Sequence, residues 1–571
     1  SNGQVFDENF LMMIATFAAF GLGVFGDAQY SEALAVMLFY QTGEAFQDYA
    51  VGQSRASIAE MMEIAPESAF VLNGDETEEL DPEDVEVGSI VVVRPGDKVP
   101  LDGIIIEGES FLDTSALTGE SVPRRVSEGD DIISGCVNGE GMLKVRVTKE
   151  YDDSTVAKIL ELVENASARK AVLENFVTRF ARVYTPIVTI GAALLAILMP
   201  LVFNLSWAEG IERACNFLIV SCPCALVISV PLGFFGGIGA ASRIGVLVKG
   251  SNFLEAAANL DTMVFDKTGT LTKGEFKVSS IVPTEGVDTD ELLELAAYGE
   301  VYATHPIGKS ILEAASSKDI DTSRLEDVQN VTGRGTSAKL DEKPLLVGSR
   351  KLLLENDIKE IFEESSSELG TLTFVSYDGK YKGYIVIADT IKEDAKTSIA
   401  ELKNEGVKRT VMLTGDRKKT AEAVAAGLGL DDVKYELLPA DKIEEVEELI
   451  SKNKEGDSKL GYVGDGINDA PVLMRADVGF AMGSLGSDAA IEAADIVLMD
   501  DDLRKLPMIL RIAKRTMRIV KSNIAFAIGV KVLILILSAF GLASMWVAVF
   551  GDVGVSIICI INSMRVLKFR Q

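Results

Sequence analysis

The residues best suited to covalent chemistry are Asp266 and the threonines and glycine that follow it. Asp266 comes directly after the apolar run 262–265, and this pattern predicts a buried strand that ends in a carboxylate. A carboxylate at the carboxyl end of a central parallel strand, next to Thr and Gly, can attack a phosphoryl group and form an acyl phosphate. Such an intermediate divides one difficult hydrolysis into two easier steps. The competing interpretation is an ordinary turn at a strand end.

Two further strand-like runs, 411–413 and 461–463, also end in polar residues. Those residues are Thr414, Gly415 and Asp416 after the first run, and Gly464 and Asp465 after the second. A helix is expected from about residue 420 to 426, and Lys442 follows it. Three acidic strand ends with a lysine between them suit an α/β phosphotransfer fold of the haloacid-dehalogenase type.

Composition indicates membrane segments joined to acidic soluble domains. The chain has 571 residues, of which 48% are hydrophobic and 25% are charged, and its formal net charge is −31. This length predicts several domains, and the mixture of apolar and charged residues favours a membrane protein. The acidic balance argues against nucleic acid as a partner. The five scattered cysteines are too few for a disulfide framework, which favours a reducing compartment.

Several apolar stretches are candidate membrane spans. They cover residues 10–25, 33–46, 183–205, 214–235, 524–540 and 542–561. The first two are shorter than the roughly 20 residues that cross a bilayer as a helix. Glu44 lies near the end of the second stretch, where it can face headgroups as an interfacial acid or line an ion exit.

The stretch 214–235 contains two cysteines separated by a proline. On a regular helix, residues i and i+2 point roughly 200° apart, so Cys222 and Cys224 could not share a ligand. Pro223 lacks an amide hydrogen and clashes with the carbonyl of Ile219, so we expect the helix to open and both thiols to turn inward. Thiolates select ions such as Cu⁺, Zn²⁺ or Cd²⁺. The alternative is a kinked core helix with two buried apolar cysteines.

The last two candidate spans each carry one charge, Lys531 and Asp552. An intramembrane charge costs at least ~2.5–3.5 kcal/mol on insertion scales, so each charge indicates a function, with the other as its partner. Two thiolates and one carboxylate balance Zn²⁺ plus the Lys531 ammonium, whereas Cu⁺ would leave a negative charge buried. After the ion leaves, Lys531 can serve as counterion to the emptied ligands. The alternative is a structural ion pair unrelated to transport.

Residues 53–170 form the first soluble region. Short β-rich runs at 90–93, 103–106 and 142–147 are separated by Gly, Pro and Asp, which predicts a small, mostly β module. The module contains the string T-G-E-S at residues 118–121, which would be a polar turn if it had no function.

Residues 276–384 interrupt the α/β pattern and predict an inserted module. It carries the only histidine of the chain, His305, before a proline. Residues 308–310 look like the end of a P-loop, but position 303 is Ala where that motif needs Gly, and no strand precedes it. Residues 333–338 fit a relaxed dinucleotide fingerprint, but a turn and strand pattern follows where a helix is required. We therefore reject both nucleotide motifs.

These motifs together resemble those of the heavy-metal P-type ATPases, in the branch that exports zinc, cadmium and lead. The string D-K-T-G-T-L-T at 266–272 is similar to their phosphorylation signature, and T-G-E-S is similar to their actuator loop. G-D-G-I-N-D-A-P at 464–471 is equally specific, and the His-Pro and Gly-x-Gly pairs resemble their nucleotide-binding domain. In this branch a Lys and an Asp stand where Lys531 and Asp552 lie, whereas the copper branch has other polar residues there.

The resemblance implies a multidomain membrane protein. Its expected fold is an α-helical transmembrane bundle, with six helices in this chain, a mostly β actuator domain, an α/β haloacid-dehalogenase-like phosphorylation domain and an inserted α+β nucleotide-binding domain. The expected division is membrane helices in 1–52, 171–257 and 511–571, the actuator domain in 53–170, the phosphorylation domain in 258–275 and 386–510, and the nucleotide-binding domain in 276–385. The family usually has two further helices before the first pair, and often a metal-binding domain, so the sequence is expected to be part of a longer protein.

The resemblance also implies a role for each motif residue. Asp266 would accept the phosphoryl group of ATP, and Glu120 would act as general base for the water that removes it. Thr414, with Gly415 beside it, and Lys442 would neutralise phosphate oxygens.

The implied cofactors are ATP and Mg²⁺. Asp465 would hold Mg²⁺ with Asp266 and the Thr268 carbonyl, while Asn468 and Asp469 would fix that loop. The residues expected around adenine and ribose are Glu300, His305, Gly333, Gly335 and Gly348. The residues expected to bind the transported metal are Cys222, Cys224 and Asp552, with Lys531 as counterion.

The sequence therefore predicts a pump that exports Zn²⁺, Cd²⁺ or Pb²⁺ from the cytoplasm through an aspartyl phosphate. Two alternatives are a Cu⁺ pump of the same class and a membrane-anchored haloacid-dehalogenase-type phosphatase whose thiols are structural. We expect a monomer in a bacterial plasma membrane, in contact with lipid and the transported ion, with its soluble domains in the cytoplasm.

Overall fold

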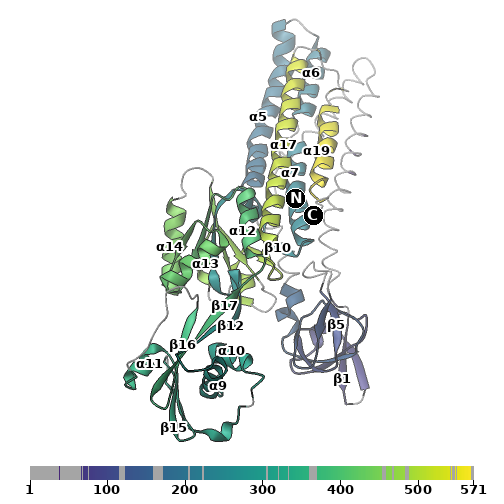
Figure 1. Cartoon of the computed structure of the whole chain (residues 1–571). Helices are drawn as coiled ribbons and strands as arrows, with labels where there is room; N and C mark the ends of the chain where they lie inside the picture. Colours follow the sequence, from purple (N-terminus) through teal and green to yellow (C-terminus); the bar gives the residue numbers. More distant parts are fainter. Residues whose placement is uncertain are drawn as a thin grey trace. The chain divides into compact units, whose positions relative to one another are not determined.

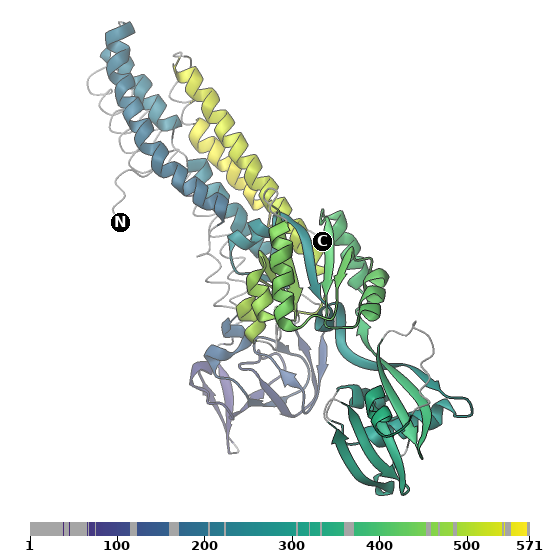
Figure 2. The same ribbon diagram turned by 90° about the vertical axis from the view of Figure 1, so that its left-hand side faces the viewer.

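The computed structural model divides the chain into two units (Figures 1 and 2). The first comprises Ser1–Leu260, Gly483–Asp500 and Lys505–Gln571, and the second comprises Asp261–Met482 and Asp501–Arg504. The described residues are 38, 41, 45, 66, 68–74, 76–114, 123–158, 171–203, 206–221, 224–303, 306–318, 320–331, 334–358, 370–452, 458–465, 469–482, 488–539, 542, 547 and 550–567. For some helical residues, Cys224 and Asp552 among them, only the backbone is described.

The first soluble region is a β module of two sheets, as the sequence predicts. The larger sheet has the order β2-β1-β3-β9-β4-β7, and the smaller one has the order β6-β5-β8. The strands are β1 (Ala69–Asn73), β2 (Glu76–Leu80), β3 (Ile90–Val93), β4 (Gly103–Glu107), β5 (Ser110–Asp113), β6 (Arg124–Val126), β7 (Asp131–Ile132), β8 (Val137–Asn138) and β9 (Leu143–Val147). Burial alternates along β9, so one face of the larger sheet covers the core of the module.

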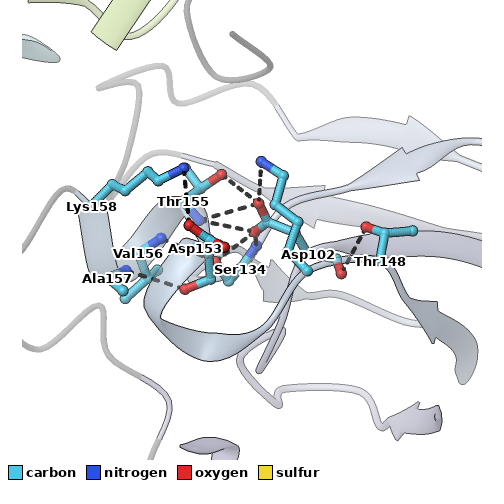
Figure 3. Close-up of polar contacts among 10 residues, drawn as sticks. Asp102, Ser134, Thr148, Asp153, Thr155, Val156, Ala157 and Lys158 are labelled. Carbon is cyan, nitrogen blue, oxygen red and sulfur yellow. Dashed lines mark hydrogen bonds and ion pairs between the residues drawn. The ribbon is translucent and has the colours of Figure 1, made fainter. Parts of the chain in front are cut away.

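A buried carboxylate ties the larger sheet to the segment that leaves the module (Figure 3). Asp102 is 4% exposed and accepts hydrogen bonds from the hydroxyls of Ser134 and Thr155, both 2.7 Å long. The backbone amides of the same two residues also donate to this carboxylate. Lys149 Nζ lies 3.4 Å from Asp102 Oδ2. Thr155 begins the helical segment that ends the described part of the module, so Asp102 fixes where the chain departs from the sheets.

The second unit contains parallel strands in the order β21-β20-β11-β18-β19. Their bounds are β11 (Leu260–Asp266), β18 (Arg409–Leu413), β19 (Asp432–Lys434), β20 (Lys459–Gly464) and β21 (Val478–Ala481). The helices that accompany them are α12 (Ala395–Asn404), α13 (Lys418–Leu428), α14 (Pro439–Lys452) and α15 (Ala470–Arg475). Strand β11 is buried along most of its length, as expected for a parallel sheet covered on both faces. Helix α13 is longer at both ends than the predicted stretch 420–426.

The inserted module is built on an antiparallel sheet of order β12-β17-β16-β15-β14-β13. The strands are β12 (Thr272–Pro283), β13 (Leu325–Val331), β14 (Gly335–Leu340), β15 (Lys343–Gly348), β16 (Thr371–Tyr377) and β17 (Lys380–Ile391), and the helices are α9 (Thr289–Glu300), α10 (Pro306–Ala314) and α11 (Arg350–Glu355). Residues 308–310 lie in α10 and a strand pair follows residue 335, which confirms the rejection of both nucleotide motifs. Strand β17 runs through the predicted domain boundary between residues 385 and 386.

The apolar helices belong to the first unit. They are α5 (Val172–Phe203), α6 (Trp207–Val220), α7 (Cys224–Ser242), α17 (Lys505–Ala539) and α19 (Val555–Met564), which follows the π-helical turn η6 (Phe550–Gly554). Within the described residues, the segments Pro186–Phe203, Ala225–Ser242 and Lys505–Ser538 are long and apolar enough to cross a membrane. The predicted spans 10–25 and 33–46 lie outside the described residues except at positions 38, 41 and 45, so the six-helix bundle stays a prediction.

Glycines let α7 approach its neighbours closely. A Cβ atom at Gly233 would lie 2.7 Å from Val520 Cγ2, and one at Gly237 would lie 2.6 Å from Thr516 Oγ1. Both neighbours are on α17, so small residues bring the two helix backbones together, as in many membrane helix pairs. The remaining elements of this unit are α8 (Ser251–Ala258), α16 (Asp488–Ala493), β10 (Val246–Val248) and β22 (Ile496–Leu498).

Candidate active site

Three strand ends that the sequence singled out meet at one edge of the parallel sheet. Asp266 ends β11, and β11 lies between β20 and β18 in the sheet. Asp266 is in register with Leu413, the residue before Thr414. Asp465 follows β20 on the other side. The structure therefore brings these side chains to a common edge, as their positions in the sequence predict.

Lys442 extends from α14 to this edge. Its Nζ lies 2.7 Å from Asp266 Oδ1 and 3.0 Å from Asp469 Oδ1. The side chains of Lys442, Asp266 and Asp469 are only 13%, 11% and 2% exposed, so these are charge-assisted contacts screened little by water. We call Asp266, Lys442, Asp465 and Asp469 the catalytic centre.

Burial and like charge dominate the electrostatics of the catalytic centre. Burial, followed by the Asp469 carboxylate, raises the pKa of Asp266 to about 7, although Lys442 opposes the shift. Burial by itself would lower the pKa of Lys442, but the charges of Asp266 and Asp469 outweigh it and raise that pKa. The ammonium therefore stays protonated, and further positive charge at this edge would favour the Asp266 anion, the form that can attack phosphorus.

The oxygen atoms of the catalytic centre fit Mg²⁺. Asp469 Oδ2 is buried and has no hydrogen-bond partner among the described residues. Gly269 has a φ of +72°, and a Cβ there would lie 2.9 Å from Asp465 Oδ2, so the loop that contains Thr268 passes close to this carboxylate. The described part of the chain holds no cluster of three His, Cys, Asp or Glu side chains able to bind a metal. Mg²⁺ suits such a place, because it is commonly held by one or two carboxylates and several waters.

The structure adds an ion pair that the sequence analysis did not assign. Lys267 Nζ lies 2.7 Å from Asp416 Oδ2, and the Lys267 side chain is 11% exposed. The Asp416 amide donates to Thr414 Oγ1 at 3.1 Å, which places Thr414 and Gly415 beside the same pair. Lys267 lies in the string 266–272 and Asp416 follows the strand-like run 411–413, so both residues were visible in the sequence. That they pair is shown only by the tertiary structure.

A second lysine joins the loop after Asp266 to the segment that precedes α17. Lys392 has a side chain 6% exposed, and its Nζ lies 3.4 Å from the Gly269 carbonyl and 3.3 Å from the Asp501 carbonyl. Asp394 Oδ2 also accepts a 2.7 Å hydrogen bond from the Leu503 amide. Residues 501–504 directly precede α17 in the chain, so the loop after Asp266 is hydrogen-bonded to the segment before that helix. Sequence analysis missed Lys392 because it belongs to no motif.

Two of the predicted nucleotide-binding glycines lie directly opposite each other on neighbouring strands of the inserted module. Gly335 and Gly348 are paired across β14 and β15, and a Cβ at either would lie 2.5–2.7 Å from the Cα of the other. Gly299 packs against Val347, which brings the neighbouring Glu300 to the same end of β15. Burial raises the pKa of Glu300 to about 6. The structure thus pairs two of the predicted nucleotide-binding glycines on neighbouring strands, while their role in binding a nucleotide stays a prediction.

The remaining predicted residues are placed only in part. Glu44, Glu120, Cys222, His305 and Gly333 lie outside the described residues. Cys224 begins α7 and Asp552 lies in η6, each described by its backbone alone. Lys531 lies in α17 and is 6% exposed. The opening of the helix at Pro223, which is also outside the described part, stays a prediction.

Comparison with known proteins follows the same division of the chain. Residues 63–164 match the P-type ATPase actuator domain, and residues 260–477 match the haloacid dehalogenase-like hydrolases. The cadmium, zinc and cobalt-transporting ATPase of Bacillus subtilis (strain 168) is 52% identical over 100% of this chain and 80% of its own length. The zinc-transporting ATPase of a Synechocystis strain is 48% identical over 99% of this chain and 77% of its own length. A crystal structure of a zinc-transporting PIB-type ATPase in the E2.Pi state superposes with a TM-score of 0.63 and 34% identity, covering 99% of this chain and 91% of that one.

Proposed function

This chain belongs to the heavy-metal-transporting P-type ATPases, and we propose that it uses ATP to export divalent heavy-metal ions, Zn²⁺ and Cd²⁺ foremost. The observation that carries the proposal is the catalytic centre, where Asp266 ends a central parallel strand with Lys442 at 2.7 Å. An ion pair on the protein surface would be screened by water and would stabilise a phosphoryl group little. The Asp266–Lys442 pair is buried at the carboxyl edge of the sheet, where its charges act strongly on a phosphoryl group.

The first step is transfer of a phosphoryl group to Asp266. A carboxylate oxygen of Asp266 attacks the γ-phosphorus of ATP, and the bond from that phosphorus to the β,γ-bridging oxygen breaks as ADP leaves. We assign to Lys442 and Thr414 the stabilisation of the equatorial oxygens, Lys442 by its positive charge and Thr414 by a hydrogen bond from its hydroxyl. Mg²⁺ would be held by Asp266, Asp465 and the Thr268 carbonyl, and it would supply additional positive charge to the phosphate oxygens.

The second step is hydrolysis of the aspartyl phosphate. Water attacks phosphorus, the bond to the Asp266 oxygen breaks, and the water proton passes to a general base. We assign that base to Glu120 by the likeness of its T-G-E-S string to the actuator loop of the family.

Charge balance supports a divalent cargo. Cys222, Cys224 and Asp552 would supply three negative charges, and the buried Lys531 supplies one positive charge, so a divalent ion completes a neutral set. The names of the relatives add cobalt to zinc and cadmium, and Co²⁺ satisfies the same balance. Pb²⁺ does so as well. The comparisons favour a divalent-metal pump over a Cu⁺ pump or a phosphatase, because the relatives are named as transporters of divalent metals and match along nearly the whole chain.

The proposal includes a location and partners. Helices apolar enough to cross a membrane, together with bacterial relatives, support a multi-pass protein of the bacterial cell membrane with its catalytic domains in the cytoplasm. Lipid and the transported ion are the expected partners, and we expect a monomer.

ATP hydrolysis by the purified, lipid-reconstituted protein tests this function. Zn²⁺, Cd²⁺, Co²⁺, Pb²⁺ and reduced Cu⁺ are titrated in turn, with Asp266→Asn as the inactive reference. Stimulation by the divalent ions and not by Cu⁺ supports the proposal. Stimulation by Cu⁺ alone would contradict the charge balance, and metal-independent hydrolysis of small phosphate esters would support a phosphatase.

A further inference from the structure

A polar network crosses the interface of three helices in the membrane region. Asn523 of α17 donates from its amide nitrogen to the Cys559 carbonyl at 3.0 Å and to Ser563 Oγ at 2.9 Å. Its amide oxygen accepts from Asn562 Nδ2 at 2.8 Å. Ser563 Oγ in turn donates to the Ser229 carbonyl of α7 at 2.9 Å. We call Asn523, Cys559, Asn562, Ser563 and Ser229 the membrane junction.

The membrane junction is buried and has Asn523 at its centre. Asn523 is 2% exposed, and Cys559, Ser563 and Ser229 are each 0% exposed. Asn523 uses both amide hydrogens and its oxygen, so its side chain is nearly saturated with partners. An amide without partners would be costly in an apolar environment, so the helices have one preferred axial position in which all these bonds form.

The contacts of α17 with the returning chain define a register. Asn523 meets residues 559–563, and Ile534, farther along α17, meets the earlier residue Gly551, so the two segments are antiparallel. Lys531 lies eight residues beyond Asn523, about 12 Å along the helix, and Asp552 lies seven residues before Cys559, about 10 Å at the same rise. The two contacts therefore bracket Lys531 and Asp552 and bring their backbones to similar depth.

Glycine packing alone would not fix this register. Gly233 and Gly237 of α7 bring its backbone close to α17, but a small-residue surface is smooth and specifies distance better than axial position. Directional hydrogen bonds, by contrast, are lost when one helix slides past the other. The membrane junction supplies such bonds at one level of the bundle.

We propose that Asn523 is a positioning residue for ion transport: it fixes the register of α17 against α19 and thereby holds Lys531 at the depth of Asp552. The inference rests on the proposed function, because it takes these two residues as parts of the transport site. Asn523 touches neither the ion nor the nucleotide in this account. It acts through the two charges whose relative depth it sets, in the way that outer-shell residues orient the ligands of other metal sites.

The test replaces Asn523 with leucine, which has the same branched side-chain skeleton and removes every side-chain hydrogen bond. Zn²⁺-stimulated ATP hydrolysis of the lipid-reconstituted chain is measured for wild type, Asn523→Leu and Ser229→Ala. The control removes a buried hydroxyl that has no hydrogen-bond partner among the described residues and leaves the Ser229 carbonyl in place. We expect Asn523→Leu to raise the half-maximal Zn²⁺ concentration at least about tenfold, as outer-shell changes commonly do, with maximal turnover within about twofold of wild type. Ser229→Ala should shift neither value by more than about twofold.

A double-mutant cycle separates positioning from general stability. In a Lys531→Met background, Asn523→Leu should add little to the half-maximal Zn²⁺ concentration, because the charge that it positions is already absent. Full additivity of the two changes, or an Asn523→Leu protein of lower thermal stability with unchanged Zn²⁺ dependence, would overturn the inference. If Asn523→Leu fails to fold, Ser563→Ala, which breaks two of the same bonds, is measured with an expected rise of about threefold. If the wild-type protein shows no metal-stimulated ATP hydrolysis, the proposed function itself is contradicted. If the wild type responds to Zn²⁺ and Asn523→Leu has the same Zn²⁺ dependence, only the positioning role of Asn523 is contradicted.

Discussion

The catalytic centre and the membrane junction are both polar clusters with buried residues, but the first consists of charged groups and the second of neutral hydrogen-bonding groups. The catalytic centre contains three carboxylates and one ammonium, with Lys442 Nζ 2.7 Å from Asp266 Oδ1 and 3.0 Å from Asp469 Oδ1. The membrane junction contains no charge: two side-chain amides, one hydroxyl and two backbone carbonyls share hydrogen bonds of 2.8–3.0 Å. Asp266 and Asp469 in the first cluster, and Asn523 and Ser563 in the second, are buried.

The difference follows from what each cluster must do. In the proposed function the catalytic centre gains and loses a phosphoryl group and Mg²⁺. Such a role needs charges whose balance can change, and it is compatible with the raised pKa of Asp266. A junction that only holds helices in register needs direction without charge, because an unbalanced charge is far more costly in lipid than a neutral amide. Charge thus marks the reacting part of the molecule, and neutral bonds mark the part that holds position.

Removal of Lys442 should break the charged cluster most severely. Lys442→Met leaves Asp266 and Asp469 buried side by side without their cation, which costs transition-state stabilisation and ground-state stability. We expect ATP hydrolysis to fall by about 10³-fold, while Lys442→Arg retains part of the activity. Steady-state hydrolysis at saturating Zn²⁺ measures both. A loss below about tenfold in Lys442→Met would mean that the ammonium does not serve the phosphoryl group.

A methyl group at Gly269 should disturb the Mg²⁺ ligands without any change of charge. Gly269→Ala would place a Cβ 2.9 Å from Asp465 Oδ2 and strain a backbone with φ of +72°. We expect the Mg²⁺ concentration for half-maximal phosphorylation to rise by about tenfold or more. Gly274→Ala is the matched control, because Gly274 has a φ of +69° and its nearest neighbouring atom would be 3.9 Å away. Equal effects in the two variants would assign the loss to backbone strain alone.

Lys392 tests whether the charged cluster is linked to a membrane helix. Lys392→Met removes the contacts from Nζ to the Gly269 and Asp501 carbonyls, so the loop after Asp266 loses its bond to the segment before α17. We expect metal-stimulated hydrolysis to fall by about tenfold, with a smaller fall in basal hydrolysis. Lys273→Met, at a lysine 42% exposed on the neighbouring strand, should change either rate by less than about twofold. A proportional loss of both rates in Lys392→Met would contradict the link.

The smallest expected effect concerns Glu300, a buried acid outside the catalytic centre. Burial raises the pKa of its carboxyl to about 6, above its ordinary 4.5, so the folded module binds this proton more tightly than the unfolded chain. Its contribution to stability is present below pH 4.5 and is lost as the pH rises through about 6. Glu300→Gln should stabilise the inserted module by up to about 2 kcal/mol at pH 7.5 and hardly at pH 4. Calorimetry of the full chain at both values measures this, with the exposed Glu313→Gln as control. Equal stabilisation at both pH values would contradict the assigned cause.

The sequence predicted those features that a short stretch of residues determines, such as strands and the polar residues at their ends. Strand β3 was placed at its observed bounds, and the strand ends at Asp266 and Asp465 were predicted to share one edge, because buried runs and acidic ends are visible in the sequence. Lys392 and Asn523 were not predicted, since each is a single polar residue whose partners lie far away along the chain. The start of α17 was missed for another reason: Arg511, Lys514, Arg515 and Arg518 interrupt the apolar pattern of its first turns, so no apolar stretch there is long enough to indicate a membrane span.

Formation of the phosphorylated intermediate tests the central claim most directly. The lipid-reconstituted chain is incubated with γ-labelled ATP and Mg²⁺, either with Zn²⁺, with reduced Cu⁺ or without added metal, and the acid-stable, hydroxylamine-sensitive label is counted for wild type and Asp266→Asn. The account predicts label in wild type that requires Zn²⁺ and is not produced by Cu⁺, and no label in Asp266→Asn. Label that persists in Asp266→Asn, or that forms equally well without any metal, would contradict it.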